Sequence, residues 1–393
     1  MTQHPLADAI KRNSLEDARQ RIRQGEKLPA GLPDFDKKQV FDALVRGKAF
    51  DLIDELVKTG FIETDLYEYE RFDGTIFESL FRNLRDTPEE LAFLQSFVSK
   101  LDNINDALQD KTLLETALLA SAPLEVIKVL IAAGCSVHYK NNYEIGYLYK
   151  VVQEFGIREE LGTAYLELLI GEGVDPNEGN VVNETALHLA VSKHKKQYID
   201  LLLRHGADPN LQNKSGESPY YYALVHQVCG PELYQMLKAY APPDFNSVNK
   251  DGESLFVGTV RMRRRPSDHD IDILKTLIAD GADPYQTAPY YGQGKSALDW
   301  IVEQPAEALR AVLDTGAVDV NRKDDEGNTL LHKVCAYNVN YDQEAARQLY
   351  RKAKLLLDAG ADVNSTNDAD QTPMMLAAQD NLKAKTVELL VKQ

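Results

Sequence analysis

Histidine and cysteine are the side chains that most often indicate a catalytic or metal site by their spacing, because they serve as nucleophiles, general bases and metal ligands. The three cysteines, Cys135, Cys229 and Cys335, lie about a hundred residues apart, and no C-x-x-C pair occurs. None of the eight histidines stands four residues from another histidine or from a cysteine, the spacing that sets two zinc ligands on one helix face. No phosphate-binding or nucleophile-elbow motif occurs either. We therefore expect no catalytic residue, no metal and no cofactor, and we expect that the chain is not an enzyme.

Aromatic side chains suggest recognition rather than catalysis. The chain has 19 tyrosines and a single tryptophan. Tyrosine and tryptophan provide large contact areas at a low cost in side-chain entropy, so they often anchor protein interfaces. The candidate partner-binding aromatic residues are Tyr222, Tyr290, Tyr291, Trp300 and Tyr337. The alternative is that several of them only fill gaps in the packing.

The charge of the chain is uneven. The net charge is −17, and residues 51–110 hold 15 acidic and 5 basic residues, a net charge of −10. Within them, the stretch DLYEYERFD mixes carboxylates with Tyr67, Tyr69 and Phe72, a mixture that suits a basic protein surface. Its candidate binding residues are Asp65, Glu68, Glu70 and Asp73. The alternative is that these charges only maintain solubility.

The only dense basic run is formed by Arg261, Arg263, Arg264 and Arg265. Arg261 and Arg263 are candidates for pairing with an acidic patch of a partner or with carboxylates of the chain itself. Nucleic acid is not an expected partner, because the run is short and the protein is acidic.

Cysteine usage and hydropathy indicate the compartment. An odd number of dispersed cysteines is typical of a reducing environment. The N-terminal residues lack the apolar core of a secretory signal, and no run reaches the roughly 18 apolar residues that a membrane span needs. We expect a cytoplasmic protein that does not bind membranes and is a monomer on its own.

The stretch 183–210 predicts two short helices joined by a polar turn. Thr185 begins a helix over 186–193, and a second helix over 198–205 has apolar residues at helical spacing. Gly206 follows, and glycine commonly ends a helix because it has no Cβ to clash in the left-handed conformation.

The same helix-starting Thr or Ser and helix-ending Gly recur along the chain. The glycines that end second helices are Gly25, Gly60, Gly134, Gly173, Gly206, Gly281, Gly316 and Gly360. The residues that begin first helices are Thr75, Thr112, Thr185, Ser218, Ser254, Ser296, Thr329 and Thr372, with Glu144 in the slot between Thr112 and Thr185.

The sequences TALHLA, from Thr185, and LLLRHGADPN, ending at Asn210, resemble the ankyrin repeat, whose signature is T-P-L-H-x-A with a period of about 33 residues. The resemblance is specific over residues 111–393 and weak over residues 1–110. It implies an all-α solenoid of about nine to eleven helix–turn–helix repeats with short β-turn fingers. It also implies that His188 and His332 are structural. We expect residues 111–393 to form the array and residues 1–110 to form a degenerate helical cap, the alternative being a separate helical domain.

The resemblance implies a non-catalytic interaction module or scaffold that binds a protein through the concave face of the fingers and first helices. A sharper hypothesis is an inhibitor, such as an immunity protein, that neutralises one basic protein. It is motivated by the acidic residues 51–110 and by the lack of an appended effector domain. The alternative is an enzyme, or an effector delivered into a host cell, whose activity lies in the divergent residues 1–110.

Overall fold

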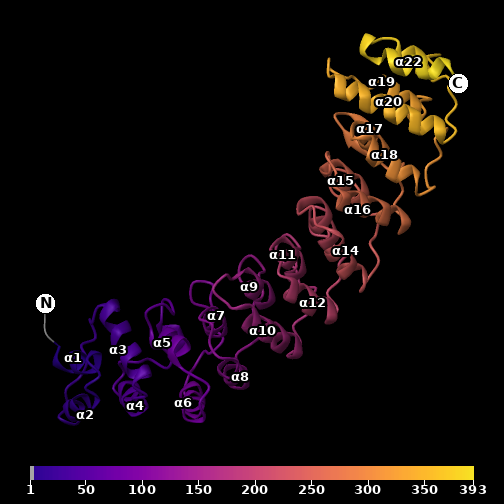
Figure 1. The fold of residues 1–393 in the computed structure, drawn as a ribbon. Coiled ribbons are helices and arrows are strands. Elements are labelled where there is room, and N and C mark those ends of the chain that lie inside the picture. The colour runs from indigo at the N-terminus through magenta and orange to yellow at the C-terminus, as the bar shows by residue number, and fades with distance from the viewer. Residues whose placement is uncertain (1–3) are drawn as a thin grey trace. The chain divides into compact units, whose positions relative to one another are not determined.

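The computed structural model describes residues 4–393, which form helices joined by short turns (Figure 1). The chain divides into two compact units, Met1–Ala207 (unit 1) and Asp208–Gln393 (unit 2). No helix among residues 4–393 is long and apolar enough to cross a membrane.

Unit 1 is built from helix pairs in which two short antiparallel helices are followed by a loop that leads to the next pair. Its helices are α1 (Pro5–Lys11), α2 (Leu15–Arg23), α3 (Asp34–Arg46), α4 (Phe50–Lys58), the 3-10 turn η1 (Leu66–Glu68), α5 (Ile76–Asn83), α6 (Pro88–Val98), α7 (Leu113–Leu119), α8 (Leu124–Ala132), α9 (Tyr147–Gln153), α10 (Glu159–Gly171), α11 (Ala186–Ser192) and α12 (Lys196–Arg204).

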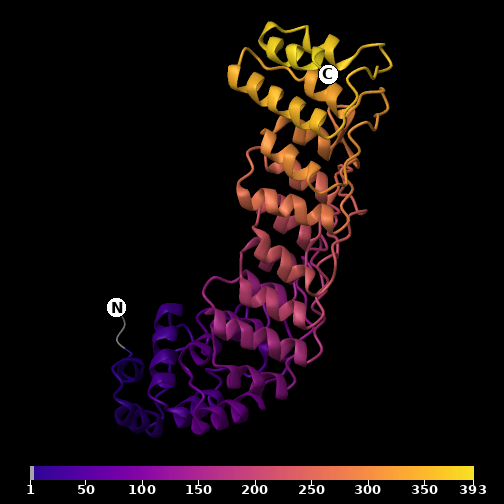
Figure 2. The same cartoon turned by 45° about the vertical axis from the view of Figure 1, so that its right-hand side comes forward.

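Unit 2 repeats this arrangement with more variation in length. Its elements are α13 (Pro219–Tyr221), which continues into the π-helical turn η2 (Tyr222–His226), α14 (Pro231–Lys238), α15 (Leu255–Met262), α16 (Asp268–Ala279), β1 (Thr287–Tyr290), β2 (Gln293–Ser296), α17 (Ala297–Glu303), α18 (Ala306–Leu313), α19 (Leu330–Ala336), α20 (Gln343–Asp358), α21 (Pro373–Ala377), the 3-10 turn η3 (Asn381–Lys383) and α22 (Ala384–Val391). The loops that join one helix pair to the next, in both units, are hereafter called fingers. Figure 2 shows those of unit 2 gathered along one side of the helices.

The predicted Thr and Ser helix starts and the closing glycines are confirmed, whereas α12 begins two residues before the predicted 198–205 and ends one residue before its end. Each of the eight Thr and Ser residues expected to begin a first helix is the N-cap of one. Thr185 is typical: its side chain accepts a hydrogen bond from the backbone N–H of His188, one of the groups left unpaired at a helix start. Each of the eight predicted closing glycines has a positive φ, between 71° and 105°. Glu144 does not begin a helix: it lies in a finger turn at φ 57°, and Gly146 is the N-cap of α9.

Packing continues from each pair to the next, which confirms the predicted all-α solenoid architecture within each unit. In unit 1, α5 packs between α3 and α7, and α10 packs between α8 and α12. In unit 2, α18 packs between α16 and α20, and α17 packs between α15 and α19. The apolar stripe of each helix is therefore buried only against its neighbours, as in repeat proteins. The predicted boundary between residues 110 and 111 lies inside unit 1, where α6 packs on α8.

Candidate protein-binding surfaces

The acidic finger segment, Asp65–Asp73, connects α4 to α5 in unit 1, and its backbone is fixed by local bonds. The carboxylate of Asp65 accepts hydrogen bonds from the backbone N–H of Tyr67 at 3.0 Å and from the side chain of Asn103 at 2.7 Å. The backbone also pairs with the next finger, because the Leu66 N–H donates to the carbonyl of Asp102 at 3.2 Å. Leu66 is fully buried. The segment is therefore a shaped surface loop.

Three carboxylates of this segment face solvent. Glu68, Glu70 and Asp73 are exposed, and no salt bridge within residues 4–393 involves them or Asp65. Arg71 lies between them in sequence, but its guanidinium pairs with Asp34 at 2.7 Å. The predicted acidic residues thus share one finger and are not neutralised by ion pairs.

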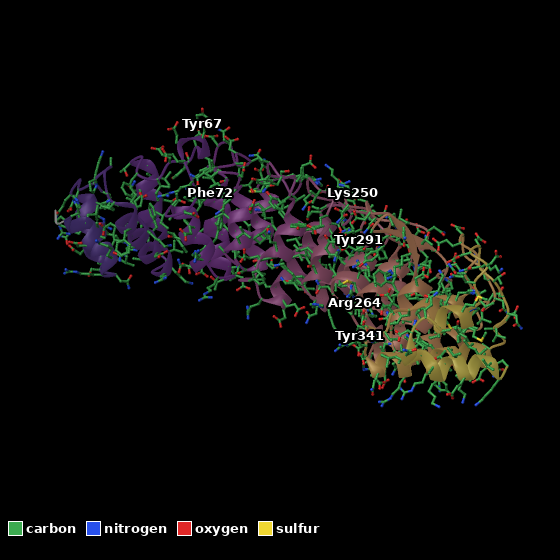
Figure 3. All side chains as sticks on the ribbon, turned by 90° about the horizontal axis from the view of Figure 1, so that it is seen from above. Tyr67, Phe72, Lys250, Arg264, Tyr291 and Tyr341 are labelled. Atoms are coloured by element: carbon green, nitrogen blue, oxygen red, sulfur yellow. The ribbon has the colours of Figure 1, made fainter. Side chains whose placement is uncertain are left out.

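Only one of the three aromatic residues of the segment is largely exposed. Tyr67 is 75 % exposed, and Figure 3 shows it projecting from the ribbon while Phe72 lies among the helices. Phe72 is buried and packs edge-on against Phe77, with ring centroids 5.8 Å apart. The hydroxyl of Tyr69 donates to the carbonyl of Glu63 at 2.9 Å. The expectation that Phe72 belongs to the recognition surface is therefore wrong, whereas Tyr69 is half-buried and stays a candidate.

In unit 2, a finger hairpin presents a second group of predicted residues. Strands β1 and β2 pair antiparallel, and Tyr291 and Gly292 form the tip between them. Tyr291 is 91 % exposed, and its ring lies edge-on to that of Tyr290 at 4.7 Å. Tyr290 in turn contacts the ring of Trp300 on α17 at 4.8 Å. The structure therefore brings three of the five predicted aromatic residues together.

Trp300, a predicted partner-binding residue, is buried and not exposed. Only 4 % of its surface is exposed, because the hairpin covers one side of α17. The ammonium group of Lys295 lies over the indole, and the guanidinium carbon of Arg264 stands 6.0 Å from the ring centroid. Trp300 therefore supports the hairpin, and the exposed groups of this cluster are Tyr290, Tyr291 and Arg264, of which Figure 3 labels the last two.

The two remaining aromatic candidates are half-buried and lie outside this cluster. Tyr222 begins the π-helical turn η2, where its ring meets that of His226 edge-on at 5.2 Å. Tyr337 caps the end of α19, and the ammonium group of Lys352 lies 5.4 Å from its ring centroid. Each ring leaves part of its surface accessible, but neither is joined to another predicted aromatic residue.

The basic run divides into a buried and an exposed half. Arg263 is only 3 % exposed, and its guanidinium donates to Asp270 at 2.9 Å and to the carbonyls of Leu224 at 2.6 Å and Cys229 at 3.1 Å. Burial lowers the pKa of Arg263, and the charge of Asp270 opposes that shift. The prediction that Arg263 contacts a partner is therefore wrong. Arg261 is half-buried against Glu253 at 2.5 Å, which is the internal pairing that the sequence left open.

The histidines of the T-x-L-H slots have structural partners. The imidazole of His188 hydrogen-bonds Thr185 at 2.8 Å, and that of His332 hydrogen-bonds Thr329 at 2.8 Å. The second nitrogen of His332 lies 3.0 Å from the carbonyl of Gln371, in the following finger. These contacts fix helix starts to fingers.

Cysteine and metal chemistry find no support among the described residues. Cys335 is fully buried, and burial raises the pKa of its thiol to about 12, so the nucleophilic thiolate is strongly disfavoured. Within residues 4–393, no group of three or more His, Cys, Asp or Glu side chains could hold a metal ion.

The structure is that of an α-helical repeat protein. Each repeat is a pair of helices, in which Thr or Ser begins most of the first helices, Gly follows most of the second helices, and a finger leads to the next pair. Residues 160–249 match the family model for ankyrin repeats, which describes three copies. Residues 160–249 therefore form ankyrin repeats, as the resemblance of Thr185–Asn210 indicated. Ankyrin-repeat domains generally bind proteins and are typically not catalytic.

Many solved structures are similar to the chain, and three of them are as follows. The ankyrin repeat domain of Bcl-3, a member of the IkappaB protein family, is 24 % identical with a TM-score of 0.48, and the match covers 61 % of this chain and 96 % of that domain. The human ASB11 ankyrin repeat domain is 18 % identical with a TM-score of 0.44, over 63 % of this chain and 98 % of that one. A chain from the complex of the predatory endopeptidase Bd0816 of Bdellovibrio bacteriovorus with the immunity protein Bd3460 is 18 % identical with a TM-score of 0.39, over 53 % of this chain and 97 % of that one. No curated protein matches the chain.

Proposed function

We propose that the chain is a non-catalytic binding module whose acidic finger segment holds a basic surface of a protein partner. The observation that carries the proposal is the exposure of Glu68, Glu70 and Asp73 on one finger, without a salt bridge to any residue among 4–393. Because these carboxylates have no internal cation, a partner's lysines and arginines can pair with them without first breaking an ion pair.

Physical chemistry makes this pairing selective. The segment belongs to a region, residues 51–110, with a net charge of −10, and such a field attracts basic proteins and repels acidic ones. Charge alone gives little affinity at physiological salt, because exposed pairs contribute about 0–1 kcal/mol each. Tyr67 supplies the second requirement: an exposed aromatic ring beside the carboxylates that can bury apolar surface against the partner.

The finer form of the proposal is an inhibitor that neutralises one basic protein, as an immunity protein does. An array of this kind would act by covering the basic functional surface of its target. The charge of residues 51–110 supports this form, because an inhibitor benefits from rapid, electrostatically steered association.

The test is capture of partners by tagged protein in its native cells, with the bound proteins identified by mass spectrometry at two salt concentrations. The triple variant Glu68→Lys, Glu70→Lys and Asp73→Lys reverses the charge of the finger without touching Asp65, which holds the loop. We expect one stoichiometric basic partner that is weakened by salt and binds the variant about tenfold or more less tightly.

A matched control reverses three exposed carboxylates of unit 2, Glu307→Lys, Asp314→Lys and Asp325→Lys. It changes the total charge by the same amount, so partner binding should be retained if the finger is the site. An equal loss of partner binding in both variants would show that binding depends on the net charge of the protein and not on the finger. Equal retention of the partner by the finger variant and the wild type would exclude the acidic finger segment as the binding site.

A further inference from the structure

A groove of about 540 Å³ lies in unit 2, between α20 and the segment formed by η3 and α22. Its apolar floor consists of Ala346 and Tyr350 on α20, with Leu382 and Ala384 facing them. Polar and charged side chains complete the lining, namely Gln343, Arg347, Arg351, Asn381 and Lys385. None of these residues belongs to the acidic finger segment or to the hairpin cluster, so the groove is a separate surface.

The groove results from a mismatch in helix length. Helix α20 has 16 residues, whereas its neighbours α18 and α22 have 8 each (Figure 1). Because α22 is half as long, it cannot cover the whole of α20. The residues of α20 that line the groove all fall between Gln343 and Arg351, in the N-terminal turns of that helix. Ala346 and Tyr350 in this part of the helix are therefore only half-buried by the array.

Cations stand on both walls of the groove. Arg347 and Arg351 are four residues apart, so they lie one turn apart on the same face of α20. Both guanidinium groups share one carboxylate, Glu344, at 3.3 and 3.7 Å, and Lys385 on the facing wall pairs with Glu388 at 2.9 Å. The three cations Arg347, Arg351 and Lys385 thus pair with only two carboxylates, those of Glu344 and Glu388. Exposed pairs of this kind are weak and exchange readily with an incoming carboxylate.

We propose that this groove binds an acidic amphipathic helix of a protein partner. Its apolar face would pack on Ala346, Tyr350 and Leu382, and its flanking glutamates would pair with the arginines of α20 and with Lys385. The spacing of Arg347 and Arg351 matches carboxylates one turn apart on a helix that runs along α20. Burial of one helix face in a groove between two helices is a recurrent mode of peptide recognition. The inference goes beyond the proposed function, because it concerns another surface and a partner of opposite charge.

The experiment measures the binding of synthetic helical peptides to the full chain by fluorescence anisotropy. The probe peptide carries leucines at i, i+3, i+4 and i+7 and glutamates on either side of them. A second peptide has lysines in place of the glutamates. We expect the acidic peptide to bind and the basic peptide to bind at least about tenfold less tightly, with an affinity for the acidic peptide that falls as salt rises.

Two variants locate the binding. The double variant Arg347→Glu and Arg351→Glu should weaken binding of the acidic peptide about tenfold or more. The control Arg204→Glu changes a similarly exposed arginine on α12 of unit 1 and should leave that binding unchanged. Ala346→Gln keeps the charge and adds bulk to the floor, and it should also weaken binding. Unchanged melting temperatures will show that the variants are folded.

The proposal is overturned if the acidic peptide does not bind the wild type, if both groove variants bind it normally, or if the basic peptide binds equally well. The assay uses no basic partner, so its outcome is independent of the charge-reversal test on unit 1.

Discussion

The ammonium group of Lys295 lies 3.4 Å from the ring centroid of Trp300 and 2.5 Å from the carboxylate of Glu303. Lys295 belongs to strand β2, whereas Trp300 and Glu303 belong to α17. The Lys295 side chain therefore links the finger hairpin to α17 through a cation–π contact with Trp300 and an ion pair with Glu303. The exposed Tyr291 at the hairpin tip depends on that fastening for its position.

Lys295→Met should reduce the stability of unit 2, because it removes the cation from the indole face. We expect a loss of about 0.5–2 kcal/mol in the free energy of unfolding. Urea unfolding followed by the fluorescence of Trp300, the only tryptophan, measures it directly. Glu303→Gln removes the ion pair but keeps the ammonium over the ring, so its loss should be smaller. Equal losses in the two variants would assign the effect to the ion pair instead.

Arg263→Met should be among the most destabilising substitutions in unit 2. It removes the donors to two backbone carbonyls, those of Leu224 and Cys229, and leaves Asp270 without its cation. Breaking a fully buried pair costs about 3–5 kcal/mol, and because Asp270 is partly exposed we expect a loss near the lower end of that range. Chemical denaturation measures the loss, with the exposed Arg265→Met as a control that should change stability by less than about 0.5 kcal/mol. The idea fails if the two substitutions have similar effects.

Lys352 should make stability depend on pH in the alkaline range. Its ammonium group is buried and donates to the carbonyls of Val302 and Gln304 at the end of α17. Burial lowers the pKa of Lys352 from 10.5 to about 8. A lowered pKa means that the folded state takes up the proton less readily than the unfolded state. The cost of the charge is therefore fully present below about pH 8 and disappears as the pH rises to about 10.5.

The measurement compares the unfolding free energies of the wild type and of Lys352→Met at about pH 7.5 and about pH 9.5. The wild type should gain about 2 kcal/mol relative to the variant between these two values. The comparison cancels the other groups that titrate in this range, because they are common to both proteins. A constant difference between the two proteins would show that Lys352 titrates at its ordinary pKa.

Helix boundaries were predictable from the sequence because single residues determine them. Thr185 caps α11 through its own hydroxyl, and Gly206 ends the next helix by its freedom to adopt φ 89°. Glu144 misled the prediction because it occupies the usual spacing without a capping geometry. Its φ of 57° places it in a turn, and the backbone of Gly146 begins the helix instead.

The burial of the candidate site residues could not be predicted, because it depends on contacts distant in sequence. Arg263 looked like part of an exposed basic run, yet one of its acceptors is the carbonyl of Leu224, 39 residues earlier. Trp300 has an outward slot on its own helix, and it is covered only because the hairpin folds over it. The groove beside α20 was missed for a similar reason, since it follows from a difference in length between helices of different repeats. The exposed carboxylates of Glu68, Glu70 and Asp73 were found because a local run of charge rarely becomes buried.

Gly162 and Tyr198 provide a test of packing between α10 and α12 in unit 1. A Cβ atom added at Gly162 would lie 1.9 Å from the hydroxyl of Tyr198 and 2.7 Å from the adjacent ring carbon. Gly162→Ala should therefore destabilise the protein by about 1–3 kcal/mol, although alanine in a helix is usually favoured over glycine by about 1 kcal/mol. Tyr198→Phe should cost little, because this buried hydroxyl has no hydrogen-bond partner within residues 4–393. The double variant should recover part of the loss, since the hydroxyl is removed and only ring carbons would remain close. Thermal unfolding of the three variants measures these effects, and a Gly162→Ala protein more stable than the wild type would show that α10 and α12 move apart at negligible cost.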